Sequence, residues 1–167
     1  MSDGHALRAA EGFGLRLVET AAPVGHQVVG DEQVGRGVLG ALLEETVYLA
    51  ALTGDPLEAH RDAPWIAGTP GTLCHTMTVR ACQATGYTPR VRHHADDFGT
   101  VLALVAAGQG VALIPELGLL APPPDVVLTA LPTRRRTRLA YRRGTGGHPA
   151  VLAARSALHA SVVGRKQ

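Results

Sequence analysis

The loop "GTPGT" at residues 68–72 is the segment whose residue types and spacing point most directly to chemistry. The hydroxyls of Thr69 and Thr72 would lie at the start of a helix, where backbone N–H groups and the helix dipole favour an anion. Two glycines, Gly68 and Gly71, leave the loop backbone accessible. The loop therefore predicts a site for a small carboxylate or phosphate, and ordinary helix capping is the alternative.

The segment "HHADDF" at residues 93–98, together with Cys74 and His75, offers imidazole, thiolate and carboxylate groups, which are ligands of zinc and other transition metals. Adjacent histidines on a strand point to opposite faces, however, and Cys74, His75 and Cys82 do not share one helical face. We therefore expect no metal site. The alternative role for the two aspartates in this segment, Asp96 and Asp97, is to cap a helix.

Nothing in the chain indicates nucleophilic catalysis or a bound cofactor. The serines lie in terminal segments, a G-x-S-x-G motif is absent, and neither cysteine has a signature of activation. The loop at 68–72 has neither the lysine of a phosphate-binding loop nor the glycine spacing of a dinucleotide-binding fingerprint. We expect a protein that is not an enzyme, with no catalytic residue and no cofactor.

A run of arginines, "TRRRTR" at residues 133–138, suggests phosphate binding, and Arg142 and Arg143 extend it. We expect the run to form a turn between two strands, where arginines are usually solvated. A small nucleic-acid binder that uses residues 134–143 therefore remains an alternative function.

Composition limits the possible classes of protein. Of the 167 residues 46% are hydrophobic, 18% charged and 4% aromatic, and the net charge is +2. These values indicate a globular chain and exclude a disordered tail. No uninterrupted apolar segment is long enough for a secretory signal or a membrane span, so we expect a cytoplasmic protein with reduced cysteines.

The elements that must position these groups alternate along the middle of the chain. Apolar runs predict strands at 45–52, 65–68, 90–94 and 111–115, and helical periodicity predicts helices at 73–85 and from 98 to about 105. Such alternation is typical of an open α/β layer. Outside it we expect short strands at 15–20 and 26–31, further strands at 126–132 and 138–143, and a C-terminal amphipathic helix that buries Val151, Ala154, Leu158 and Val162.

This order of motifs resembles the second effector-binding lobe of LysR-type transcriptional regulators, from "PWIAGTPGT" at residue 64 to "IPEL" at residue 117. The most specific part is "VLALVAAGQGVALIPE" at 101–116, a helix, a glycine turn and a strand that ends in proline. The segment at 126–160 is similar to the return of that family's chain to its first lobe.

The resemblance implies an α/β, type II periplasmic-binding-protein-like fold. One lobe would be complete, with a mostly parallel sheet and helices on both faces, and part of a second lobe would accompany it. Residues 1–46 would be a remnant of the first lobe, 47–122 the second effector-binding lobe, and 123–167 the return segment with its helix. The implied function is small-molecule effector binding by a regulatory region without the family's DNA-binding winged helix-turn-helix, since no segment before Glu45 offers that pattern.

The family's effector cleft lies at the start of the helix expected at 73–85 and beside the turn into the next helix. Loops that follow neighbouring parallel strands gather at one edge of the sheet, so these two turns should converge. The ligand-binding residues implied in this way are Gly68, Thr69, Gly71, Thr72, Asp97, Phe98 and Thr100.

The expected partner is a small-molecule effector, a carboxylate or aromatic acid. We also expect a homo-oligomer through lobe helices, the helix at 73–85 in particular, with no DNA binding by this segment alone and no membrane contact. A stand-alone solute- or partner-binding α/β module is the first alternative.

Overall fold

A computed structural model describes residues 16–23, 32–34 and 37–164 of the chain. Contacts divide the chain into two units: unit 1 comprises residues 1–44 and 136–167, and unit 2 comprises residues 45–135. The division places residues 123–135 in unit 2, whereas the sequence assigns them to the return segment.

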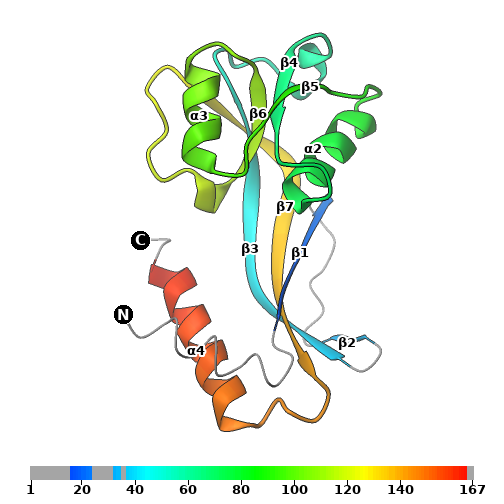
Figure 1. Ribbon diagram of the computed structural model, residues 1–167, viewed down its shortest axis with the longest axis vertical. Helices are drawn as coiled ribbons and strands as arrows, with labels where there is room; N and C mark the ends of the chain where they lie inside the picture. The colour runs from blue at the N-terminus through cyan, green and yellow to red at the C-terminus, as the bar shows by residue number, and fades with distance from the viewer. Residues whose placement is uncertain (1–15, 24–31, 35–36, 165–167) are drawn as a thin grey trace. The chain divides into compact units, whose positions relative to one another are not determined.

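Unit 2 is built on the sheet order β3-β6-β4-β5. Its strands are β3 (Gly37–Ala51), whose second part lies in the unit, β4 (Pro64–Ala67), β5 (Arg90–His94) and β6 (Val111–Pro115). β4 runs parallel to both β5 and β6, and β3 is antiparallel to β6 (Figure 1). The strands expected at 65–68, 90–94 and 111–115 therefore share one mostly parallel sheet, which confirms the central part of the sequence prediction.

Two helices connect the parallel strands of unit 2, α2 (Leu73–Ala84) after β4 and α3 (Phe98–Ala106) after β5. β5 and β6 lie on opposite sides of β4, so right-handed crossovers place the two helices on opposite faces of the sheet (Figure 1). The core beneath α3 includes Ile66, Val105 and Ile114, each at most 1% exposed. Two short 3₁₀ helices, η2 (Leu57–His60) and η3 (Glu116–Gly118), also belong to this unit.

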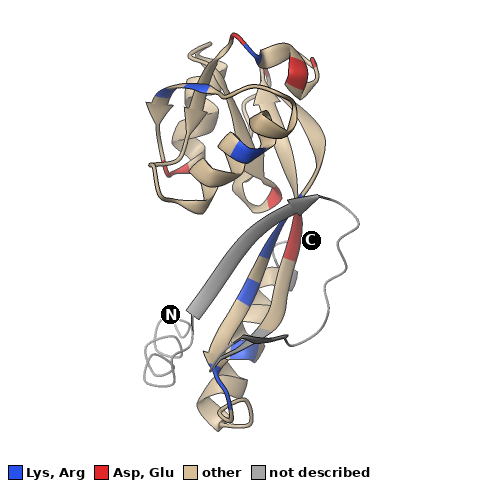
Figure 2. Cartoon of the chain, turned by 90° about the vertical axis from the view of Figure 1, so that its right-hand side faces the viewer, with Lys and Arg blue, Asp and Glu red and all other residues tan. Residues whose placement is uncertain are grey.

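The segment after the prolines is a single long strand, β7 (Val127–Arg142), which neighbours β3 in the sheet. Our prediction of two strands at 126–132 and 138–143 with a turn at 133–138 is wrong. Proline lacks the N–H that a strand ladder uses, and the arginine run interrupts the apolar pattern, so the sequence suggests a break. The strand continues because its arginines have acidic partners on β3, and Figure 2 shows blue and red segments side by side on the two long strands.

Unit 1 contains β1 (Arg16–Pro23), β2 (Glu32–Val34), the first part of β3, the end of β7 and helix α4 (Pro149–Gly164). β1 confirms the strand expected at 15–20, and the strand expected at 26–31 lies outside the described residues. β2 pairs with β3 in antiparallel fashion, with Glu32 opposite Leu39.

Helix α4 buries one apolar stripe, as its spacing predicts. Val151 and Ala154 are 0% and 2% exposed, and Leu158 and Val162 are half-buried. The Arg155 guanidinium donates to the Tyr141 hydroxyl, 3.1 Å away, and so ties α4 to β7. No helix in the described part of the chain is long and apolar enough to cross a membrane.

Candidate functional site

The loop between β4 and α2 is organised by a threonine cap. Thr72 is the N-cap of α2: its hydroxyl oxygen accepts from the His75 amide at 3.3 Å and its O–H donates to the Thr69 carbonyl at 2.8 Å. Gly71 has a φ of +92°, a conformation that side chains other than glycine rarely adopt. The capping role of this loop is therefore present, whatever else the loop does.

The loop between β5 and α3 uses an aspartate in the same way. Asp97 is the N-cap of α3, and its carboxylate accepts from the Thr100 amide at 2.8 Å and from the Thr100 hydroxyl at 2.9 Å. These two hydrogen bonds, the amide first, hold the pKa of Asp97 below its usual range. The negative charge of Asp97 is thus engaged by its own helix.

The two loops meet through Asp96. Its carboxylate accepts from the Thr69 amide at 2.8 Å and from the Thr69 hydroxyl at 2.6 Å. The Thr69 hydroxyl and amide lower the pKa of Asp96, and the nearby His94 contributes a smaller effect. A ring nitrogen of His94, Nδ1, lies 3.0 Å from the Gly68 carbonyl oxygen and makes a second link. The convergence expected from parallel-strand topology is therefore realised within unit 2.

Gly68 is required at this junction for a steric reason. A Cβ there would lie 2.7 Å from the Thr72 hydroxyl oxygen and 3.1 Å from an Asp96 carboxylate oxygen. Separations this short force neighbouring atoms to move, so the close approach of the two loops depends on a residue without a side chain.

Phe98, one of the ligand-binding residues implied by the resemblance, packs into unit 2. Its ring is half-buried and packs against the core cluster of unit 2. A Cβ on Gly118 would lie 2.7 Å from Phe98 Cδ2, so the ring is in close contact with η3. Phe98 thus connects the start of α3 with the residues that follow β6.

Sequence reasoning missed Asp96 as a link between the loops and considered it only as a metal ligand or a helix cap. A signal was nevertheless present. Thr69 follows β4 and Asp96 follows β5, and these two strands are parallel neighbours in the sheet. The donor Thr69 and the acceptor Asp96 are therefore brought to the same edge of the sheet.

Other chemistry near this edge is limited. The His75 and His94 rings are 6.1 Å apart, and among the described residues no group of three or more histidine, cysteine, aspartate or glutamate side chains could hold a metal ion. Cys82 is buried, and burial raises the pKa of its thiol to about 11. Because the thiolate is the reactive form, Cys82 acts as a core residue.

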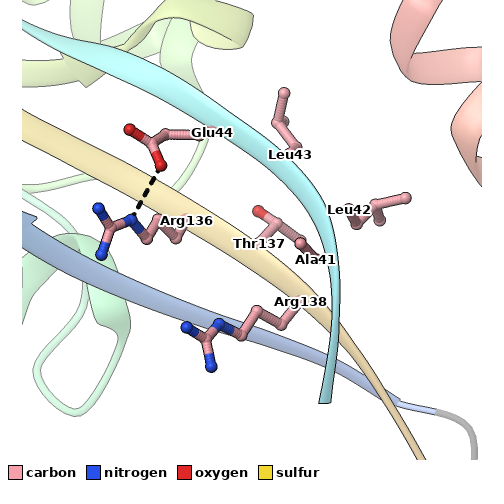
Figure 3. A pocket seen from close by; sticks show the side chains of 7 residues that line it. All are labelled: Ala41, Leu42, Leu43, Glu44, Arg136, Thr137 and Arg138. Carbon is pink, nitrogen blue, oxygen red and sulfur yellow. Dashed lines mark hydrogen bonds and ion pairs between the residues drawn. The ribbon is translucent and has the colours of Figure 1, made fainter. Parts of the chain in front are cut away.

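Unit 1 contains a separate pocket of about 260 Å³ between β3 and β7 (Figure 3). Arg136 on its rim is 5% exposed, and its Nε lies 3.0 Å from the Glu44 carboxylate. In unit 2, Arg135 Nε lies 2.8 Å from the fully buried Glu45 carboxylate. The pocket is lined by Ala41, Leu42, Leu43, Glu44, Arg136, Thr137 and Arg138. Arg135 and Arg136 therefore hold β3 and β7 together, and our expectation of solvated arginines in a turn is wrong for them. Because both are paired with glutamates, they do not support the alternative of a nucleic-acid binder that uses residues 134–143.

Comparison with known proteins identifies the family. Residues 29–162 match the family model described as LysR substrate binding domain. The HTH-type transcriptional regulator XapR of Escherichia coli K12 is 32% identical over 74 residues, which are 44% of this chain and 25% of XapR. The chain thus spans a quarter of that relative.

Solved structures agree at the level of the fold. The OxyR C206 mutant of Corynebacterium glutamicum superposes with a TM-score of 0.67 at 18% identity, over 98% of this chain and 53% of that one. The CcmR regulatory domain of Synechocystis PCC6803, solved in complex with 2-PG, superposes with a TM-score of 0.63 at 17% identity, over 95% of this chain and 77% of that one. The fold is the α/β, periplasmic-binding-protein-like fold of these regulatory domains. The chain therefore belongs to the LysR substrate-binding domain family and is an effector-binding regulatory region of the LysR type.

Proposed function

We propose that the effector is a small carboxylate, including aromatic acids, and that it binds where the loops 68–72 and 97–100 meet. The observation that supports this site is the Asp96 bridge to Thr69, which brings the first turns of α2 and α3 to one edge of the sheet. The amides of these first turns supply donors for a carboxylate, and both helix dipoles favour its charge.

The charges around the site are compatible with an acid. Asp97 would repel a carboxylate ligand if its own charge were uncompensated, but it caps α3 through Thr100. Asp96 already holds the amide and hydroxyl of Thr69, so the ligand uses the other donors of the site. Gly68, Thr69 and Asp96 then shape the site, and Gly71, Thr72 and the first residues of α3 contact the acid.

Two wider features are part of the same proposal. We place the domain in the cytoplasm as part of a transcriptional regulator, and we expect copies of it to associate through lobe helices such as α2. Exposed apolar side chains outside the helices, among them Leu52 and Leu120 at 46% and 81% exposure, are consistent with association of copies but do not select α2 as the contact.

The test is a titration of the domain with benzoate and with acetate, followed by amide chemical shifts. We expect shifts at 69–72 and 97–100, and binding of benzoate about five- to tenfold weaker in Thr72→Ala, because this substitution removes the cap that holds the loop and the first turn of α2 in place. Thr85→Ala is the matched control, because it removes a hydroxyl from the other end of α2 that donates to the Cys82 carbonyl. Shifts confined to 133–138, with both loops silent, would refute the site.

A further inference from the structure

Glu45 is a fully buried carboxylate outside the proposed effector site, and it holds two groups that are distant in the sequence. One carboxylate oxygen, Oε1, lies 2.8 Å from Arg135 Nε, and the other, Oε2, accepts from the Leu117 amide at 2.8 Å. The Arg135 side chain is 12% exposed and that of Glu45 is 0% exposed. Burying two charges is costly unless they are paired and hydrogen-bonded, so this arrangement is tightly specified.

The position of this pair in the chain is also specific. Glu45 is the first residue of unit 2 and Arg135 is the last. The ion pair therefore joins the point where the chain enters the unit to the point where it leaves. The two residues lie on β3 and β7, the strands that continue into the remainder of the chain.

The register of β3 and β6 explains why Glu45 binds Leu117. Val47 lies opposite Pro115, and continuing the same antiparallel register would place residue 45 opposite residue 117. The strand ends at Pro115 and η3 begins, so the Glu45 side chain binds the Leu117 amide. A second, longer hydrogen bond runs from the Thr46 amide to the Glu116 carboxylate at 3.4 Å.

At its other end η3 contacts the start of α3. The position of Gly118 is so close to Phe98 that a Cβ on it would lie 2.7 Å from the ring. Phe98 is the first residue of α3 and follows the capping residue Asp97. Phe98, Gly118, Leu117, Glu45 and Arg135 thus form one continuous series of contacts within unit 2.

We infer that Glu45 is a positioning residue that couples the start of α3 to the two ends of unit 2. A displacement of Phe98 moves η3, and η3 moves the Glu45–Arg135 pair through the Leu117 amide. The inference rests on the proposed function only in naming an effector at 97–100 as the cause of that displacement. If the pair were only a structural support, perturbations at Phe98 and at Glu45 would be independent and their effects would add.

The coupling is tested first without a ligand. As a single substitution in the domain that retains Glu45, Phe98→Leu is expected to shift both the Leu117 amide resonance and the Arg135 Nε–H resonance. In the Glu45→Gln background the same substitution is expected to shift Leu117 still, because the contact of Phe98 with η3 remains, and to lose its effect on Arg135. Leu104→Ala is the control, because Leu104 belongs to the same helix and packs against the same core.

Benzoate then tests the effector as the cause. It is expected to shift Arg135 Nε–H in the wild type and to leave it unshifted in Glu45→Gln. If benzoate leaves 69–72 and 97–100 silent, the proposed effector site fails, whereas the response to Phe98→Leu still decides the coupling.

The coupling is overturned if Phe98→Leu shifts Arg135 no more than Leu104→Ala does, or shifts it equally in the presence and absence of Glu45. Circular dichroism checks that Glu45→Gln is folded. Should it not fold, Arg135→Lys replaces it, because the shorter lysine keeps the charge but cannot reproduce the guanidinium geometry. In that variant Phe98→Leu is expected to move the Leu117 amide and the Glu45 side-chain resonances still, because Glu45 accepts from Leu117, and to lose its effect on the backbone amide of residue 135.

Discussion

The two units of the chain use the same two strands in different settings, and their ion pairs show the difference most clearly. Glu45 of unit 2 is completely buried with Arg135, whereas the Glu44 side chain of unit 1 is 38% exposed beside the buried Arg136. The residues are adjacent in sequence and chemically identical. Their energetic roles differ because solvent screens one carboxylate and is excluded from the other.

Replacing each glutamate by alanine is expected to give the largest change in the free energy of unfolding that distinguishes the two ion pairs. Glu45→Ala is expected to reduce the free energy of unfolding by about 3–5 kcal/mol, because it removes a fully buried carboxylate that both pairs with Arg135 and accepts from the Leu117 amide. Glu44→Ala is expected to cost less, about 1–2 kcal/mol, because water already hydrates the Glu44 carboxylate, whereas Arg136, which is 5% exposed, loses that hydrogen-bond partner. Urea denaturation of both variants measures the difference, and equal losses would show that the two settings are equivalent.

The same contrast explains what could be predicted from the sequence. In unit 2 the signals are local: Thr72 and Asp97 precede apolar residues at helical spacing, and the strand at 111–115 is an uninterrupted apolar run. Both helices and the parallel sheet were therefore predicted closely. The loops were expected to converge because this follows from parallel topology alone.

The long strands could not be predicted in the same way. Pro132 and the arginines of β7 suggest a break, and their compensation lies on β3, about ninety positions earlier in the chain, as in the hydrogen bond of Arg136 with Glu44 at a sequence separation of 92. The same limit applies to Glu45. Its partner Leu117 is 72 positions away, and an isolated "EE" before an apolar run gives no sign of it.

A smaller change in stability is expected from substitutions of a hydroxyl residue in a helix of each unit, α2 in unit 2 and α4 in unit 1. Thr72→Ala removes the cap of α2 and is expected to cost about 1 kcal/mol of stability. Ser161→Ala in α4 removes an exposed hydroxyl that donates to the Ala157 carbonyl within the helix. Alanine is the better helix former, so we expect this change to be neutral or slightly stabilising. Thermal unfolding of the two variants distinguishes them, and a loss in Ser161→Ala as large as that in Thr72→Ala would contradict the assigned difference.

The smallest expected effect is a dependence on acid pH that is local to the loops of unit 2. The pKa values of Asp96 and Asp97 are both lowered by hydrogen bonds that only their charged forms accept fully, from Thr69 and Thr100 respectively. A lowered pKa in the folded state means that the stabilisation is complete above the ordinary aspartate value of about 4 and is lost as the pH falls through the lower, folded value. The amide resonances of Thr69 and Thr100 should therefore stay constant from neutral pH to about pH 4 and move below it.

The matched comparison for this titration is α4, whose first turn contains no acidic residue. Its amides should not follow the acid transition of the two loops. In Asp97→Asn the Thr100 amide should lose its acid transition while the Thr69 amide keeps its own, because Asp96 alone serves Thr69. A Thr100 transition that survives in this variant would mean that a group other than Asp97 titrates beside the start of α3, and the capping assignment would then be wrong.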